Sequence, residues 1–98
     1  MIKSNFFDLE NKIVVIAGGT GLIGRELCRG FVECNSTTIL TSRNKTNGKK
    51  LEKELNDFHK GNVVYCQLDI SIEESIDNVI KFVLDKFSRI DVFINCSS

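Results

Sequence analysis

Short apolar segments alternate with longer amphipathic segments along the whole chain. The apolar segments are rich in β-branched residues and fall at residues 12–17, 37–41, 63–68 and 91–95. Short, continuous apolar runs are typical of strands buried on both faces of a sheet. Between them, apolar residues recur three or four positions apart, as one side of a helix requires. The pattern therefore predicts four strands that alternate with three helices.

Each predicted helix has an apolar stripe that should face the sheet. The stripes consist of Ile23, Leu27, Phe31 and Cys34 in the first helix, of Leu51, Leu55 and Phe58 in the second, and of Ile72, Ile76, Val79, Ile80, Val83 and Phe87 in the third. At the start of the third helix, Ser71 and Glu74 match a capping box, in which each side chain bonds a free backbone N–H group.

The regular alternation of elements also predicts how the strands pair. The strands begin roughly 25 to 28 residues apart, and a helix between two strands returns the chain to the same end of the sheet. The strands should therefore be parallel, with right-handed crossovers. We expect an α/β fold with a doubly wound sheet of the Rossmann type, in the strand order 3-2-1-4. One such domain, incomplete at four strands, should span residues 1–98.

A glycine-rich turn joins the first predicted strand to the first predicted helix. It contains GxGxxG at Gly19, Gly21 and Gly24, and GxxGxxG when counted from Gly18. Glycines let the backbone turn tightly and approach a pyrophosphate, and the helix start offers free N–H groups and a positive dipole. A turn that uses glycine only for backbone freedom is the alternative. The predicted phosphate-binding residues are Gly18, Gly19, Thr20, Gly21, Leu22, Ile23 and Gly24.

The type of ligand follows from what this turn lacks. A P-loop carries Gly-Lys followed by a hydroxyl residue, whereas Arg25 follows Gly24 here. A dinucleotide is therefore favoured over a nucleoside triphosphate.

The end of the second predicted strand bears on the choice between NAD and NADP. An acidic residue there accepts hydrogen bonds from the ribose 2′-hydroxyl and repels a 2′-phosphate. This chain has Ser42 and Arg43 at that place and no acid. Since a guanidinium can bind phosphate through two hydrogen bonds, we predict NADP(H) over NAD(H). Alternatively, Arg43 is a solvated charge, or it stacks on the adenine without choosing between the cofactors.

With its turn, strand ends and order of elements, the chain resembles the short-chain dehydrogenases/reductases. Ala17 replaces the threonine that often opens the family's glycine motif, and Leu22 replaces its middle glycine, so the spacing is similar to that of the extended branch. The resemblance implies that Asp69 accepts from the adenine amino group and that Ile70 lines the adenine pocket. It also implies that Asn95 lies on the nicotinamide side, where it either contacts the cofactor or supports the backbone.

The same resemblance implies an oxidoreductase that transfers hydride between NADP(H) and an alcohol or carbonyl compound of low molecular weight, acting as a homo-oligomer. The family's catalytic Tyr-x-x-x-Lys pair is missing, because the only tyrosine, Tyr65, is followed four positions later by Asp69. Ser97 and Ser98 lie too early to be the catalytic serine. We therefore expect an inactive amino-terminal fragment. The alternatives are a non-catalytic dinucleotide-binding or regulatory module and a nucleotide-sugar epimerase or dehydratase.

Charge and cysteine usage exclude other classes of partner. Thirteen basic and thirteen acidic residues cancel, so the chain lacks the positive field that nucleic-acid or membrane binding uses. No apolar run approaches the length of a membrane span, and the first residues do not resemble a signal peptide, which favours the cytoplasm. The four cysteines contain no CxxC pair, so zinc is not expected. Cys34, Cys66 and Cys96 lie in apolar segments and are predicted to be small buried residues.

Overall fold

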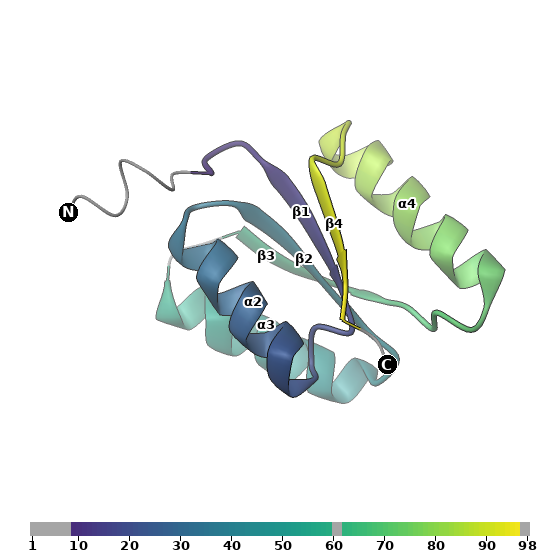
Figure 1. The fold of residues 1–98 in the computed structure, drawn as a ribbon, viewed down its shortest axis with the longest axis horizontal. Helices are drawn as coiled ribbons and strands as arrows, with labels where there is room; N and C mark the ends of the chain where they lie inside the picture. Colours follow the sequence, from purple (N-terminus) through teal and green to yellow (C-terminus); the bar gives the residue numbers. More distant parts are fainter. Residues whose placement is uncertain (1–8, 60–61, 97–98) are drawn as a thin grey trace.

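The computed structural model describes residues 9–59 and 62–96 of the chain. Figure 1 shows the predicted alternation of strands and helices around one sheet. In chain order, the elements are β1 (Ile13–Ala17), α2 (Leu22–Glu33), β2 (Thr37–Ser42), α3 (Lys45–Phe58), β3 (Asn62–Gln67), α4 (Glu73–Phe87) and β4 (Val92–Asn95). The strand order is β3-β2-β1-β4, and every pairing is parallel. Both the predicted fold class and the predicted order are confirmed.

All four strands end at the same edge of the sheet. Ala17 at the end of β1 is in register with Thr41 of β2 and with Asn95 of β4. Thr41 is in turn in register with Cys66 of β3. The segments that leave these strands therefore start beside one another, although they are far apart in the sequence.

The sheet separates two apolar layers. Helices α2 and α3 cover one face, and α4 covers the other (Figure 1). The first layer includes Cys28 and Val32 of α2, and the second includes Val79 and Val83 of α4. Since β1 and β2 are covered on both sides, their residues are almost all buried. This explains why they form continuous apolar runs in the sequence.

The apolar stripe predicted for α2 is displaced by one position, although Phe31 still packs against the first layer. The buried residues of the helix are Gly24, Cys28 and Val32, and the side chain of Ile23 is 71% exposed. A Cβ atom on Gly24 would overlap the carbonyl oxygen of Gly18, so the helix rests on the turn at this glycine. That contact sets the rotation of α2 and turns every fourth residue after Gly24 toward the sheet.

The prediction for the cysteines is corrected in the same way. Cys28, in α2, is the fully buried one, whereas Cys34, Cys66 and Cys96 are only partly buried. Burial, with a smaller contribution from the nearby Cys96, raises the pKa of the Cys28 thiol to about 12. Because the thiolate is the reactive form, Cys28 behaves as a packing residue.

The predicted capping box at the start of α4 does not form. Ile72 occupies the N-cap position and makes no side-chain cap. The Ser71 hydroxyl instead donates to Asp69 Oδ1 at 2.6 Å, and the backbone N–H of Ser71 donates to the same atom at 3.0 Å. The carboxylate two residues earlier thus competes successfully for the hydroxyl, as aspartate often does in turns.

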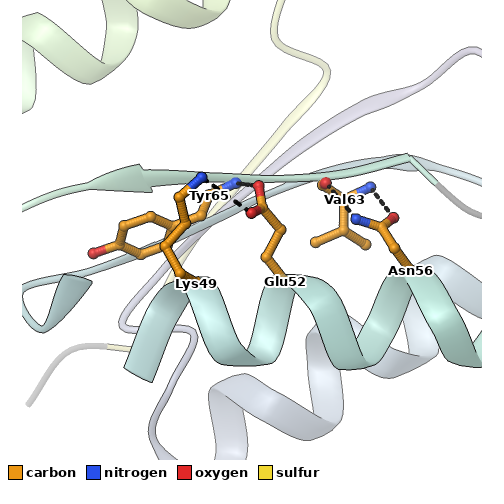
Figure 2. A network of polar contacts seen from close by, with 5 residues as sticks. All are labelled: Lys49, Glu52, Asn56, Val63 and Tyr65. Carbon is orange, nitrogen blue, oxygen red and sulfur yellow. Dashed lines mark hydrogen bonds and ion pairs between the residues drawn. The ribbon is translucent and has the colours of Figure 1, made fainter. Parts of the chain in front are cut away.

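Side chains of α3 occupy the outer edge of β3 (Figure 2). Asn56 donates to the carbonyl oxygen of Val63 at 3.0 Å and accepts from its N–H group at 3.1 Å. Glu52, one helical turn earlier, accepts from the N–H group of Tyr65 at 2.7 Å. Unpaired strand edges are open to pairing with other chains, and these two residues bind three backbone groups of this edge from within the fold.

Candidate functional site

The glycine-rich turn is built by close backbone contacts. Gly18 has a positive φ of 78°, a conformation that glycine adopts without strain. The N–H group of Gly19 donates to the carbonyl oxygen of Thr41 at 2.8 Å, which ties the turn to β2. Gly21 donates to the carbonyl oxygen of Gly18 at 3.2 Å and is the N-cap of α2. The turn therefore leads directly into the start of the helix.

The glycines of this turn fall into two groups. A Cβ atom on Gly19 would overlap Leu40, and one on Gly24 would overlap Gly18, so these two glycines allow the turn to pack against the protein. A Cβ atom on Gly21 would meet only the carbonyl oxygen of Gly18, at 3.5 Å. Gly18 and Gly21 face a cavity together with Thr20. They form the part of the turn that a ligand can approach.

This cavity lies at the carboxyl edge of the sheet and has a volume of about 420 Å³. It brings together the residues that leave all four strands. Its lining consists of Gly18, Thr20, Gly21, Ser42, Arg43, Asn44, Leu68, Asp69, Ile70, Ser71 and Cys96. The sequence-predicted site residues from three separate segments therefore meet in one place.

Five of the predicted residues do not line the cavity. Gly19 and Gly24 are buried behind the turn, and Leu22 and Ile23 project outward, with the Leu22 side chain 83% exposed. Asn95 is the last residue of β4 and lies beside Ala17. Ser97 and Ser98 lie outside the described residues, as do residues 1–8.

The end of β2 presents Arg43 to the cavity and keeps the Ser42 hydroxyl inside the protein. Ser42 is only 5% exposed, and its hydroxyl lies 3.2 Å from the carbonyl oxygen of Asn44 and 3.3 Å from Tyr65 Oη. Arg43, by contrast, is exposed. The cation is therefore the group that this strand end offers to a ligand.

Asp69 faces Arg43 from the end of β3. The Ser71 hydroxyl and the Ser71 backbone N–H group both donate to its carboxylate, and these two hydrogen bonds hold the pKa of Asp69 below its ordinary value. Desolvation opposes this shift, and the charge of Arg43 lowers the pKa slightly further. The group is thus a carboxylate at neutral pH. Because both bonds end on Oδ1, Oδ2 keeps lone pairs that can accept from an amino group. Ile70, which follows, adds an apolar part to the lining.

Four lining residues were not predicted as ligand contacts: Asn44, Leu68, Ser71 and Cys96. Each one directly adjoins a predicted site residue in the sequence, so a wider window around each strand end would have included it. Cys96 reaches the cavity because its N–H group donates to the carbonyl oxygen of Ala17 at 2.7 Å, which extends the pairing of β4 with β1 by one residue.

The arrangement fits a dinucleotide. The start of a helix attracts anions through free N–H groups and the positive end of its dipole, and Gly21, at the start of α2, leaves the backbone open to approach. Across the cavity are a cation, Arg43, and a carboxylate, Asp69. An elongated ligand with an anionic centre and an amino-bearing base matches this distribution of charge.

Comparison with known proteins gives the family of this fold and site. The sequence model of the family described as short chain dehydrogenase matches residues 12–98. The chain belongs to this family. The expectation drawn from the glycine turn and the strand ends is thereby confirmed.

Among curated proteins, the chain is 36% identical over 89 residues to the post-translational flagellin modification protein A of Campylobacter coli. It is 35% identical over 88 residues to (-)-isopiperitenone reductase of Mentha piperita. These matches cover 91% and 86% of this chain, but only 35% and 28% of the respective relatives. The chain thus spans about a third of the length of the relatives it matches.

Solved structures share the same fold. L-sorbose reductase from Gluconobacter frateurii, determined in complex with NADPH and L-sorbose, superposes with a TM-score of 0.89 at 22% identity. The match covers 94% of this chain and 35% of the reductase. In the part of the chain that the structure describes, no helix has the length and apolar character needed to cross a membrane.

Proposed function

We propose that this chain binds NADP(H) as the amino-terminal, dinucleotide-binding part of a dehydrogenase or reductase. Residues 1–98 then form a partial Rossmann domain of a larger enzyme. The observation that carries the proposal is the cavity in which the start of α2 meets Arg43, at a strand end that bears no acid. Family membership supports the same activity, because the curated relatives include reductases and dehydrogenases.

Each part of the dinucleotide has a counterpart in the cavity. The pyrophosphate would lie at Gly18–Gly21 and the start of α2, where free N–H groups stabilise its charge. Asp69 would accept from the adenine amino group, and Ile70 would pack against the base. Arg43 would pair with the ribose 2′-phosphate, because a guanidinium binds phosphate through two parallel hydrogen bonds. Asn95, at the end of β4, would lie toward the nicotinamide.

When bound, the nicotinamide supplies or accepts a hydride at a carbonyl or alcohol carbon of a small substrate. Within this chain, Tyr65 is unsuited to transfer the accompanying proton, because it is buried and its hydroxyl donates to the carbonyl oxygen of Ser42 at 2.7 Å. We therefore place the proton-transferring residues outside these 98 residues. Hydride transfer remains favoured over a purely regulatory role or a nucleotide-sugar epimerase activity, because the curated relatives carry the names of reductases and dehydrogenases.

Titration of the purified protein with NADPH and with NADH tests the proposal. We expect tighter binding of NADPH. The Arg43→Ala variant should bind NADPH about ten- to a hundredfold more weakly, as expected for losing hydrogen bonds between charged groups, and should bind NADH with little change. Equal or tighter binding of NADH that does not respond to Arg43→Ala would overturn the choice of NADP(H). Binding of neither cofactor would overturn the proposal as a whole.

A further inference from the structure

Two side chains of β3 hold the short turn that joins β2 to α3. Tyr65 Oη donates to the carbonyl oxygen of Ser42 at 2.7 Å, and Gln67 Nε2 donates to the carbonyl oxygen of Arg43 at 3.0 Å. Residues two apart on a strand project from the same face, so one face of β3 supplies both donors. Two successive peptide groups of the turn are thereby fixed in orientation.

The Tyr65 ring is itself held firmly in place. Gly48 of α3 leaves room for it, because a Cβ atom there would overlap the ring. The Tyr65 N–H group donates to Glu52 at 2.7 Å, and Lys49 pairs with the same carboxylate at 3.2 Å. Figure 2 shows the ring lying between β3 and the first part of α3. With the residue only 7% exposed, the phenol oxygen has little freedom to move.

The third residue of the turn is fixed as well. Asn44 accepts from the N–H group of Asn47 at 3.0 Å and caps the start of α3. The Ser42 hydroxyl, which has one proton, donates either to the carbonyl oxygen of Asn44 at 3.2 Å or to Tyr65 Oη at 3.3 Å. Each residue of the backbone from 42 to 44 therefore takes part in a hydrogen bond, and the exposed Arg43 side chain extends from this held segment.

We propose that Tyr65 is a positioning residue that directs the Arg43 guanidinium toward the ribose 2′-phosphate and so sets the preference for NADP(H) over NAD(H). The inference rests on the proposed function. Tyr65 does not line the cavity, so it acts through the carbonyl group of Ser42. A side chain whose base is fixed before binding loses less conformational freedom when it pairs with a ligand, and this strengthens the interaction. The sequence offers no direct sign of this role, because Tyr65 lies 23 residues after Ser42.

The effect is confined to one phosphate, so two nucleotide probes isolate it. Adenosine 2′,5′-bisphosphate carries the 2′-phosphate, and AMP lacks it. The Tyr65→Phe variant keeps the ring and loses the hydroxyl, and calorimetric titration measures how it binds each probe. We expect it to bind the bisphosphate about three- to tenfold more weakly, the usual effect of losing one hydrogen bond, and to bind AMP as the unaltered protein does. The ratio of the two affinities should therefore fall.

Gln67→Ala removes the second anchor without altering a buried ring, and it should lower the same ratio. Asn56→Ala is the matched structural control. It breaks the neighbouring contact of α3 with β3, at Val63, and makes no contact with the turn. It should lower the thermal stability and leave the ratio unchanged.

A double-variant cycle tests whether Tyr65 acts through Arg43. In the Arg43→Ala background, Tyr65→Phe should leave the ratio of bisphosphate to AMP affinity unchanged, because the group that it positions is gone. A ratio that stays constant in Tyr65→Phe alone, or equal weakening of both probes, would overturn the inference while leaving dinucleotide binding intact. Failure of the unaltered protein to bind NADPH and NADH would instead overturn the proposed function, and the inference with it.

Discussion

Two glycines of the same helix, Gly24 and Gly30, have opposite surroundings. Gly24 is pressed against the backbone of Gly18, whereas a Cβ atom on Gly30 would meet nothing within 4 Å. The sequence shows both as glycine and gives no sign of the difference for Gly30. For Gly24, the spacing from Gly18 and Gly21 predicted a tight turn and an approach to a pyrophosphate, but not the contact with Gly18 that sets the rotation of α2.

This contrast gives a paired test of stability. Gly24→Ala should destabilise the fold by about 1–3 kcal/mol, because the new methyl group must displace backbone atoms. Gly30→Ala should stabilise it by roughly 0.5–1 kcal/mol, because alanine has the better helix propensity and finds open space. Urea denaturation followed by circular dichroism measures both changes. Equal effects of the two substitutions would contradict the contact at Gly18.

At the scale of the elements, apolar periodicity predicted which segments form strands and helices but not every contact that they make. Strand boundaries agree to within one residue, since β-branched runs and glycine turns are local signals. The start of α4 was mispredicted because Asp69 takes the Ser71 hydroxyl. Phe58, predicted to face the sheet, is 47% exposed and instead lies under the guanidinium of Arg29, 4.3 Å from the ring centre. Neither a hydrogen bond to a nearby carboxylate nor a cation–ring contact with another helix can be read from a hydrophobic pattern.

The contact between α3 and β3 yields the next prediction. Asn56→Ala should destabilise the protein by about 1–3 kcal/mol, because it leaves a donor and an acceptor of Val63 without their partner. Lys53→Ala, on the same helix, removes an exposed ion pair with Asp57. Such pairs contribute little, so this control should change stability by less than about 0.5 kcal/mol. Thermal unfolding of the two variants measures the difference, and similar losses in both would contradict the role given to Asn56.

At the scale of the whole molecule, one carboxylate joins the segment before β1 to the segment before β4. Asp91, just before β4, accepts from the N–H group of Ile13 at 2.7 Å and from Arg89 at 2.9 Å. Arg89 also donates to the carbonyl oxygen of Asn11. This junction lies at the amino ends of the strands, opposite the cavity, so its task is to bring β4 to β1. The general rule for parallel crossovers predicted this pairing, but not the carboxylate that fixes it.

The junction should make stability depend on pH. The hydrogen bond from the Ile13 N–H group is the largest cause that lowers the pKa of Asp91 in the folded state. Desolvation opposes it with a smaller effect, and Arg89 and Lys12 lower the pKa further. The carboxylate therefore contributes stability above its unfolded pKa of about 4, and this contribution is lost as the pH falls through the lower folded value. In urea titrations between pH 2 and 7, Asp91→Asn should reduce stability most above pH 5 and least near pH 2. Asp77→Asn, on an exposed part of α4, is the control, and a pH-independent effect of Asp91→Asn would contradict the mechanism.

The side chains of α3 at the outer edge of β3 determine where the sheet can accept a further strand. A parallel sheet can accept a new strand at either edge, and here Glu52 and Asn56 occupy backbone groups that a new strand beside β3 would need. Among the described residues, β4 pairs with no strand other than β1. Any further strand, from this polypeptide or from another one, is therefore expected to add next to β4. The cavity beside β1 then lies near the middle of the extended sheet, where it is flanked by structure on both sides.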